Sequence, residues 1–506
     1  MKKIIIITIL FGVFGLGCTK LDEEIYDKIP GDLYPEDAQQ VALLGVDAYK
    51  QLQPLADDEG WWFLAQEISS DEFCGPTRDA DWFDGGKWLN VHRHDWSNDD
   101  ESVNRMWDKF FSGVTTSNQI IDLLNKLEQN ESILNKKAEI AVMRSFYYYL
   151  ILDNYGAAPY LTSAENAPAQ PYKISREALY DSIVSTVERS LPRLQVADKK
   201  YLATRYMAFA LLSKLYLNSN IYKYGGGSNW GDEALVKANA YCDSVLAGPY
   251  SLSATVSAPF ITENQNSSEI IFSIPYDEDN FQGFRLHMRT LHYQMNLKYD
   301  MPVGPWNGLC VTPNFFDTYE ESDLRREAYH IFGPQFASDG SQIIDGLTEE
   351  PLNIDPHLPA LYMTAENFTQ VQIRATGARV GKYEIKMGAK ENLSNDFPLF
   401  RITDFYLMKA EIEIRLNGAG SGDQWINPIR ERAGVSTWTG ATLDDLLSER
   451  GRELYCEGHR RQDLIRYGKF TEPWWEKTVT GDPSVTLFPI PKWATDANPN
   501  LLLDPQ

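Results

Sequence analysis

Tryptophan is concentrated in one short segment of the chain. Six of the thirteen tryptophans lie between Trp61 and Trp107, among many Asp, Asn, His and Arg residues. A sugar ring has an apolar C–H face and a rim of hydroxyl groups, so it suits an indole plane flanked by carboxylate, amide and guanidinium groups. Residues 60–100 therefore indicate a carbohydrate site, with Trp82 and Trp88 as candidate plates for a sugar. The alternative is that each tryptophan fills the core beneath an irregular loop.

A second aromatic group occurs later in the chain, at Tyr293, Tyr299 and Trp306 beside Asn307. It also falls in a segment without helical spacing. Binding residues are often carried on loops above a rigid frame. This second group could therefore close the same site.

Other chemistries have weaker support. His92 and His94 could begin a metal site, but the sequence places no third ligand, so we expect a surface pair. The run 225–228 (GGGS) lacks the Lys-Ser/Thr ending of a phosphate loop and predicts a turn. No Gly-x-Ser-x-Gly motif for acyl transfer occurs. Asp71 and Glu72 could serve as a glycosidase pair, but sequence does not supply the carboxylate separation that such a mechanism needs.

Much of the remaining chain has the apolar spacing of helices. Residues 107–124 and 138–152 each place their apolar side chains on one helical face, and the second run stops before Gly156. Thr442 begins a capping box at the start of another helix. Further helices are expected at 175–194, 203–218, 232–246, 403–416 and 443–456.

Two regions interrupt this helical pattern. Residues 60–100 lack helical spacing, and residues 250–400 hold many Pro, Gly and Asn turn signals. Within the second region, the run 270–274 (IIFSI) predicts a short strand that ends at Pro275. Successive helices joined by short links predict stacked helical hairpins, as in helical repeat proteins. We expect a mainly α frame with long irregular insertions and a few short strands.

The first residues predict export and a lipid anchor. Lys2 and Lys3 precede an apolar stretch at 4–14, and 15–18 (GLGC) follows. This order is that of a secretory signal, which is too short to span a membrane with normal flanks. A cysteine at the cleavage point resembles the lipobox of bacterial lipoproteins, in which that cysteine, here Cys18, carries acyl chains. Two such chains anchor a protein stably to a membrane.

The composition excludes one class of partner. A formal net charge of −24 argues against nucleic acid, whose phosphates need a basic face. No EF-hand spacing is present, so we expect no cofactor, although loop carboxylates could hold calcium. The cysteines other than Cys18 form no Cys-x-x-Cys pair, so buried free thiols are expected rather than a zinc site. They are Cys74, Cys242, Cys310 and Cys456.

The C-terminal third and several earlier segments carry a family resemblance. In chain order they are 21–22 (LD), 144–150 (RSFYYYL), 155–156 (YG), 159–160 (PY), 269–272 (EIIF), 405–412 (FYLMKAEI), 426–435 (INPIRERAGV), 449–454 (ERGREL), 457–460 (EGHR), 463–468 (DLIRYG), 487–491 (LFPIP) and 498–501 (NPNL). This ordered set resembles the SusD/RagB family of surface glycan-binding lipoproteins of Bacteroidetes-type bacteria.

The resemblance implies a fold of tetratricopeptide-like helical hairpins with the glycan site on inserted loops. It also implies a partner, a SusC-like TonB-dependent transporter, over which the lipoprotein sits as a lid. The segment 70–96 is similar to one in the starch-type branch of the family, which points to Asp71, Arg78 and Trp96 as glycan-binding residues. Tyr293 and Trp306 are aligned with that branch less securely.

Together these features predict five regions. They are a signal peptide at 1–17, a lipidated tether at 18–30, an N-terminal helical region at 31–250, an irregular insertion at 251–400 and a C-terminal helical region at 401–506. The acidic stretch after Cys18 is similar to signals that send such lipoproteins to the outer face of the outer membrane.

The expected function is non-catalytic binding of oligosaccharides and their delivery to the transporter. The alternative is a helical-repeat lid or scaffold for a transporter of another nutrient, such as peptides. An exported glycosidase is a third hypothesis, ranked below both. The sequence does not identify the glycan or its linkage, because loop geometry decides them.

Overall fold

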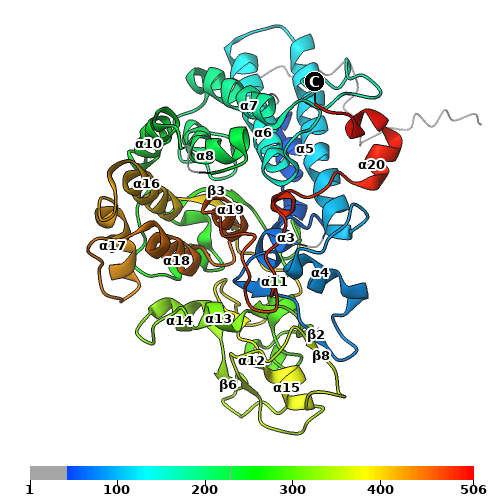
Figure 1. Ribbon diagram of the computed structural model, residues 1–506, viewed down its shortest axis with the longest axis vertical. Coiled ribbons are helices and arrows are strands. Elements are labelled where there is room, and N and C mark those ends of the chain that lie inside the picture. The colour runs from blue at the N-terminus through cyan, green and yellow to red at the C-terminus, as the bar shows by residue number, and fades with distance from the viewer. Residues whose placement is uncertain (1–40, 42, 58, 228–229, 506) are drawn as a thin grey trace, which may run out of the picture.

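The computed structural model describes residues 41, 43–57, 59–227 and 230–505 (Figure 1). The expected signal peptide at 1–17, the lipidated Cys18 and the tether at 18–30 lie outside these residues. Among the helices that the structure describes, none combines the length and the hydropathy that a bilayer-spanning helix needs.

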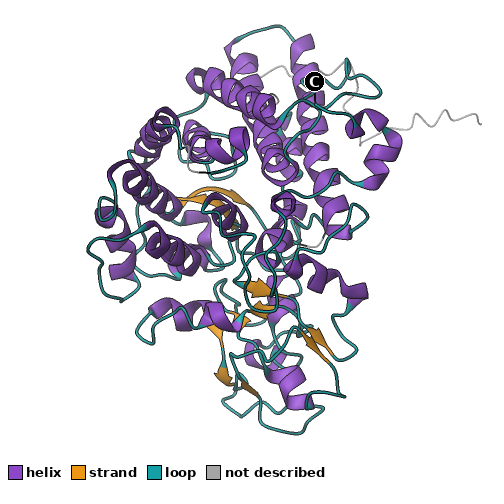
Figure 2. Ribbon diagram, viewed as in Figure 1, coloured by secondary structure: helices purple, strands orange, loops and turns teal. Residues whose placement is uncertain are grey.

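Helices account for most of the regular structure, as Figure 2 shows in purple. Their bounds are α2 Val46–Lys50, α3 Trp62–Ile68, α4 Lys87–Arg93, α5 Glu101–Lys126, α6 Glu131–Tyr155, α7 Arg176–Ser190, α8 Arg205–Leu217, α9 Ser219–Tyr224, α10 Asp232–Leu246, α11 Leu286–Thr290, α12 Asn296–Tyr299, α13 Pro313–Phe316, α14 Leu324–Tyr329, α15 Gln370–Ala375, α16 Ile402–Asn417, α17 Asp423–Arg432, α18 Leu443–Leu454, α19 Arg460–Arg466 and α20 Lys492–Ala497.

The helices predicted from apolar spacing are confirmed, and their hydrophobic faces are buried in the core. α5 buries Trp107, Phe110 and Val114 on one side. α6 is buried over nearly its whole second half and ends one residue before Gly156. α18 begins at the predicted capping box, in which the Thr442 hydroxyl accepts from the backbone N–H of Asp445. Propensity and capping thus agree with tertiary packing in these elements.

The long helices pack as neighbours in a curved stack. α5 packs against α6 and α6 against α7, while α8 packs against α10, and α10 against α16, which also contacts α17 and α18. In Figure 1 this stack fills the upper and left parts of the molecule, and residues 251–400 lie mostly in the lower part. The mainly α fold class is confirmed.

The two regions expected to lack helices contain short ones. α3 and α4 lie within 60–100, and α11 to α15 lie within 251–400. Sequence spacing missed them because they are four to seven residues long, too short to show a helical period. α3 is buried on all sides, so it has no polar face to mark it.

The described strands are short, and each pairs with a strand that is distant from it in the sequence. Their bounds are β1 Phe73–Cys74, β2 Thr77–Arg78, β3 Ile270–Ile274, β4 Cys310–Val311, β5 His330–Ile331, β6 Gly333–Pro334, β7 Asn353–Ile354, β8 Tyr362–Met363, β9 Arg379–Val380 and β10 Phe397–Arg401. β1 pairs with β4, β3 with β10, β5 with β9 and β6 with β7, all antiparallel, whereas β2 and β8 are parallel. The predicted strand at 270–274 is confirmed as β3.

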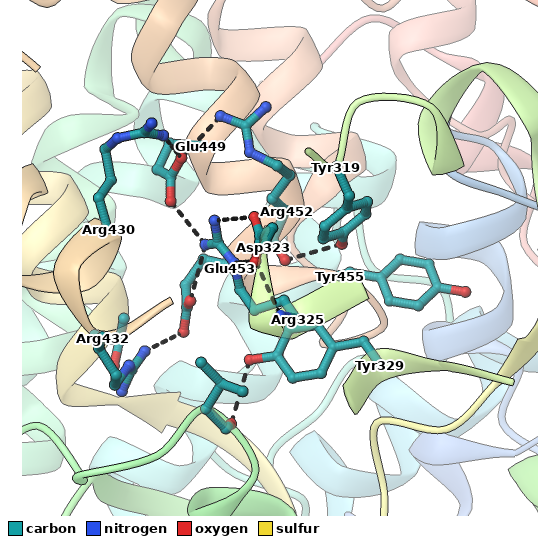
Figure 3. A network of polar contacts seen from close by, with 12 residues as sticks. Tyr319, Asp323, Arg325, Tyr329, Arg430, Arg432, Glu449, Arg452, Glu453 and Tyr455 are labelled. Atoms are coloured by element: carbon teal, nitrogen blue, oxygen red, sulfur yellow. Dashed lines mark hydrogen bonds and ion pairs between the residues drawn. The ribbon is translucent and has the colours of Figure 1, made fainter. Parts of the chain in front are cut away.

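A buried network of ion pairs joins the lower part of the molecule to the C-terminal helices (Figure 3). The carboxylate of Glu453 in α18 accepts from Arg325 of α14 at 3.1 Å, from Arg401 of β10 at 3.1 Å and from Arg432 of α17 at 2.5 Å. Each of these side chains is at most 5% exposed. Arg325 also pairs with Glu449, one helical turn earlier, at 2.7 Å.

Glu453 stays ionised in spite of its burial. Burial alone disfavours the charged form, but the positive charges of Arg432, Arg401 and Arg325 outweigh it and lower the pKa of Glu453 to about 2. Removing one member of such a network leaves buried charges without compensation, which is far more costly than losing an exposed ion pair.

We expect Glu453→Gln to destabilise the protein by about 3–5 kcal/mol at neutral pH, because three buried guanidinium groups lose a shared anion. Chemical denaturation measures this loss. The folded pKa of Glu453 is about 2 and its ordinary value is 4.5, so its contribution is present above pH 4.5 and fades as pH falls toward 2. The difference between wild type and variant should therefore shrink over that range.

The matched control is Glu431→Gln, which changes an exposed carboxylate on α17. It should alter the free energy of unfolding by about 0.5 kcal/mol or less. Equal effects of the two substitutions at neutral pH would contradict the role assigned to Glu453.

Candidate functional site

The candidate site is built where two irregular segments meet. β2 runs parallel to β8, with the backbone N–H of Thr77 donating to Leu361 at 2.9 Å and that of Asp79 to Met363 at 2.8 Å. The loop after β2 carries Trp82. The segment that follows α11 carries Tyr293 and Trp306, and backbone bonds from Trp306 and Gly308 return it to α11. The two predicted aromatic groups are thereby brought together.

Trp82 lies flat against the second segment. Its indole Nε1–H donates to the backbone carbonyl of Trp306 at 2.8 Å. Its ring covers Gly308 so closely that a Cβ at that position would lie 2.0 Å from Cε2 of the indole. The backbone φ of Trp82 is +61°, a conformation that few residues other than glycine adopt. Trp82 is therefore held in one orientation, with part of its ring exposed.

Tyr293 is fixed from two sides. Its hydroxyl donates to the carboxylate of Asp81, and burial together with this anionic partner raises the pKa of Tyr293 to about 12. The guanidinium of Arg374 lies 4.6 Å from the centre of its ring. Arg374 is itself paired with Asp345 at 2.7 Å. These contacts place an aromatic face, a carboxylate and a guanidinium within one small area.

Trp306 completes the group. The guanidinium groups of Arg285 and Arg289 lie 5.8 and 5.2 Å from the centre of its ring, and both arginines pair with Asp57. Trp306 remains partly exposed. We call Trp82, Tyr293 and Trp306, with Asp81 and Arg374, the aromatic surface.

Two of the predicted binding residues support this surface from below. Arg78 is 3% exposed, and its guanidinium donates to the carbonyls of Gly308 at 3.3 Å, Ile373 at 2.6 Å and Thr376 at 3.0 Å. Trp88 is 2% exposed, with its Nε1–H bound to Asp84. Neither presents a face or a donor to solvent, so we assign both to holding the surface rather than to touching a ligand.

Trp88 belongs to a short stack of indole rings. Its ring centre lies 4.9 Å from that of Trp61 and 5.3 Å from that of Trp82. Trp61 is fully buried. The tryptophan cluster seen in the sequence is thus divided: its inner members form core, and Trp82 alone in this stack reaches the surface.

Asp71 and Trp96 lie elsewhere. Asp71 is paired through both oxygens with Arg460, at 2.7 and 2.8 Å. Trp96 packs on Phe488 and His94, with ring centres 4.6 and 5.0 Å away. No contact recorded among the described residues joins either side chain to the aromatic surface. Their role in binding stays a prediction.

Several residues of the surface were missed from the sequence. Phe83 and Tyr362 are 45% and 47% exposed, and their rings meet edge to face at 6.0 Å. They extend the row of aromatic side chains beyond Trp82. Phe83 adjoins the tryptophan-rich segment and could have been suggested by it. Tyr362 and Arg374 carry no local signal. Tyr362 lies on β8, which pairs with β2, and Arg374 lies on α15, where the carbonyls of Ile373 and Arg374 accept from Arg78 and Asn307.

The histidine pair is buried, so its expected place on the surface is wrong. His92 donates to the carbonyl of Trp475 at 2.9 Å and His94 to that of Ser69 at 2.8 Å, and burial lowers the pKa of both. Within the described ranges, no group of three or more His, Cys, Asp or Glu side chains could hold a metal ion.

A cavity of about 450 Å³ lies away from this surface, beside α9 and α19. Its wall includes Trp230 and Arg415, and the guanidinium of Arg415 stacks 3.6 Å from the centre of the Trp230 ring. Arg415 also pairs with Glu411 at 2.8 Å. The lining of this cavity includes none of the predicted glycan-binding residues, so the aromatic surface remains the candidate site.

Comparison with known proteins gives consistent matches. A family model described as "SusD family" matches residues 268–505, and one described as "Starch-binding associating with outer membrane" matches residues 65–217. The chain is 25% identical to the starch-binding protein SusD of Bacteroides thetaiotaomicron, over 91% of this chain and 89% of that protein. It is also 25% identical to SusD-like protein P25 of Formosa agariphila, over 79% and 78%.

Solved structures show the same fold. Surface glycan-binding protein A from Bacteroides thetaiotaomicron, in complex with laminarihexaose, is similar with a TM-score of 0.71 at 21% identity, over 91% of this chain and 97% of that chain. A SusD superfamily protein from Parabacteroides distasonis gives 0.73 at 18% identity, over 92% and 98%. The resemblance drawn from sequence motifs is confirmed.

We expect Gly308→Ala to displace Trp82, because its new Cβ would occupy the space of the indole ring. Acrylamide quenching of tryptophan fluorescence should increase as Trp82 moves into solvent. The control is Gly304→Ala in the same segment, where a Cβ would meet no atom closer than 3.4 Å. Equal quenching in both variants would show that Trp82 does not rest on Gly308.

Proposed function

The chain belongs to the SusD family, and on this premise we propose that it is a lipid-anchored protein of the outer membrane surface that binds oligosaccharides. It does not cleave them, and it delivers them to a SusC-like TonB-dependent transporter. The observation that carries the proposal is the aromatic surface, where Trp82, Tyr293 and Trp306 are partly exposed next to fixed polar groups.

The chemistry of the surface suits a sugar. Indole and phenol rings can cover the apolar face of a pyranose, while the Asp81 carboxylate and the Arg374 guanidinium can share hydrogen bonds with its hydroxyl groups. These side chains are held in place by other protein groups before any ligand arrives. Little conformational entropy then remains to be lost on binding.

The relatives support a glycan as the ligand. SusD of Bacteroides thetaiotaomicron is named a starch-binding protein, and one structural neighbour was solved with laminarihexaose. These are different glucans, so the shared fold admits more than one linkage. The linkage bound by this chain depends on its own loops at 79–86 and 291–307.

A binding role without catalysis fits the carboxylates at the surface. Asp81 accepts from Tyr293, Asp84 accepts from Trp88, and Asp345 pairs with Arg374. A glycosidase needs one carboxyl group free to donate a proton and a second free to attack or activate water. Two of the relatives reported above, SusD and surface glycan-binding protein A of Bacteroides thetaiotaomicron, are likewise named as binding proteins.

The anchor and the transporter complete the proposal. Cys18 at the end of the predicted signal would carry the lipid, and the residues after it would form a tether. One family model is described as associating with the outer membrane. The second candidate function keeps this location and the transporter but replaces the glycan by another nutrient, such as a peptide.

We expect Trp306→Ala and Tyr293→Ala each to weaken binding of the cognate oligosaccharide by about 1 kcal/mol or more, which is about fivefold in Kd, because each removes one stacking face. A glycan array identifies the ligand, and isothermal titration calorimetry then measures Kd. The control is Trp493→Ala, an indole that is 49% exposed on α20, a helix in the upper part of Figure 1, away from α11 and β2.

Three results would contradict this assignment. Unchanged affinity in both site variants would remove the aromatic surface from the binding site. An array without any bound glycan would favour the second candidate. Release of new reducing ends from a bound glycan would support a glycosidase instead.

We expect the native lipoprotein to co-purify with a TonB-dependent transporter from detergent-solubilised outer membranes. Mass spectrometry of the complex identifies the partner. The Trp306→Ala protein should retain the transporter, because the proposal assigns that side chain to the glycan alone. Isolation of the native protein without a transporter would contradict delivery while leaving glycan binding intact.

A further inference from the structure

Two cysteines face each other across the strands that join the two site-bearing segments. Cys74 of β1 and Cys310 of β4 are direct partners in the antiparallel register, 236 residues apart in sequence. Their sulfur atoms lie 3.8 Å apart. Directly opposed residues of antiparallel strands have Cα atoms about 4.5–5.5 Å apart, within the range of about 4.4–6.8 Å found for disulfides.

We propose that Cys74 and Cys310 form a disulfide that fastens β1 to β4 when the protein folds in an oxidising compartment. The bond requires the two sulfur atoms to approach each other by about 1.8 Å, since a disulfide is about 2.05 Å long. Rotation of the two side chains can supply this movement without separating the strands. The inference concerns the covalent state of the chain and does not rest on the identity of the ligand.

The surroundings favour one sulfur as the nucleophile. The guanidinium of Arg78 donates toward the sulfur of Cys310 at 3.8 Å. Although burial opposes ionisation, the Cys74 thiol and the positive charges of Arg78 and Arg379 lower the pKa of Cys310. Cys74 keeps its proton, because burial and the neighbouring Cys310 raise its pKa. A thiolate beside a thiol is the arrangement that thiol–disulfide exchange uses.

The reaction balances with a disulfide as the oxidant, either that of a dithiol oxidoreductase or oxidised glutathione. The Cys310 thiolate attacks one oxidant sulfur, and a mixed disulfide forms as the other sulfur leaves as a thiolate. Cys74 then loses its proton and attacks the sulfur of Cys310, which releases the second oxidant sulfur. The protein pair loses two electrons and the oxidant gains them as two thiols.

Burial determines at which stage Cys74 and Cys310 can be oxidised. Both side chains are fully buried, so an oxidant reaches them during folding or through local opening. Exported proteins meet disulfide oxidants at that stage. Once closed, the bond lies beneath the aromatic surface and is protected from reductants by the same burial.

The other two described cysteines lack such a partner. The sulfur of Cys242 lies 2.8 Å from the hydroxyl of Ser213, between α8 and α10. Cys456 follows α18 at a φ of +58° and has no recorded contact with another cysteine among the described residues. They serve as internal controls, because an unspecific oxidant would modify them as well.

The Cys74–Cys310 bond would connect the two segments that carry the aromatic surface. β1 leads through β2 into the loop that carries Trp82, and β4 follows directly from Trp306 and Gly308. Arg78 already links the two segments by donating to the carbonyl of Gly308. A covalent link at Cys74–Cys310 would hold the two halves of the aromatic surface in register.

The experiment traps the native lipoprotein with N-ethylmaleimide during cell lysis and determines its thiols by mass spectrometry under denaturing, non-reducing conditions. We expect two alkylated residues, Cys242 and Cys456, and a linked peptide that contains Cys74 and Cys310. Four alkylated cysteines in the native protein would overturn the proposal, as would a link between any other pair.

A second experiment tests disulfide formation in refolded variants and the effect of a reductant on their Tm. The chain with Cys18→Ser, refolded in a glutathione redox buffer, should form the same link, and so should its Cys242→Ala and Cys456→Ala derivatives. A reductant that is present during thermal unfolding should lower its Tm by a few degrees, at most about 5 °C, because the reduced chain loses the bond that closes a long loop in the unfolded state. The Tm of the Cys74→Ala derivative should not respond to reductant; an equal response would overturn the proposal.

Discussion

The structure depends on a group of charges that have no access to water. Glu453 is shared by Arg325, Arg401 and Arg432, which come from three separate elements, and Glu449 holds Arg325 from the next turn of α18. A buried charge is tolerated only when its partners are correctly placed. The network therefore fixes α14 and β10 against α17 and α18. It sets the position of the lower part of the molecule relative to the helical stack, and so the position of the site.

In the lower part of the molecule, the chain is held in place by short strands that pair distant segments, rather than by long helices or strands. The strands are two residues long except for β3 and β10, and each pair joins positions far apart in the chain or across a loop. Trp82 and Trp306 meet next to the β1–β4 pair, where Trp82 donates to the carbonyl of Trp306 and Arg78 donates to that of Gly308. A substitution at Gly308 can consequently act on a side chain more than two hundred residues earlier in the sequence. The aromatic surface thus depends on tertiary contacts, whereas the helices that carry it follow from local sequence.

The contrast between local helices and a surface formed by tertiary contacts explains which features could be predicted from the sequence. α5, α10 and α18 follow from their apolar period, because one helical face must be buried, and a capping box also marks the start of α18. The sequence also located both halves of the aromatic surface. It did not separate Trp82 from Trp88, since an indole that stacks on a neighbour in the core has the same composition signal as one that stacks on a sugar. Nor did it place Tyr362 or Arg374, which come from β8 and α15 and reach the surface only through tertiary contacts.

The charge at the surface constrains the ligand further. Asp79, Asp81 and Asp84 are exposed on the loop that carries Trp82, within a chain whose net charge is −24. The nearby arginines are already paired, Arg374 with Asp345 and both Arg285 and Arg289 with Asp57. A polyanionic glycan would meet repulsion without an uncommitted cation to offset it among these groups. An uncharged oligosaccharide carries no negative charge to be repelled, and its hydroxyl groups can donate to the carboxylates. If the aromatic surface binds a glycan as proposed, its charges favour a neutral sugar over a polyanionic one.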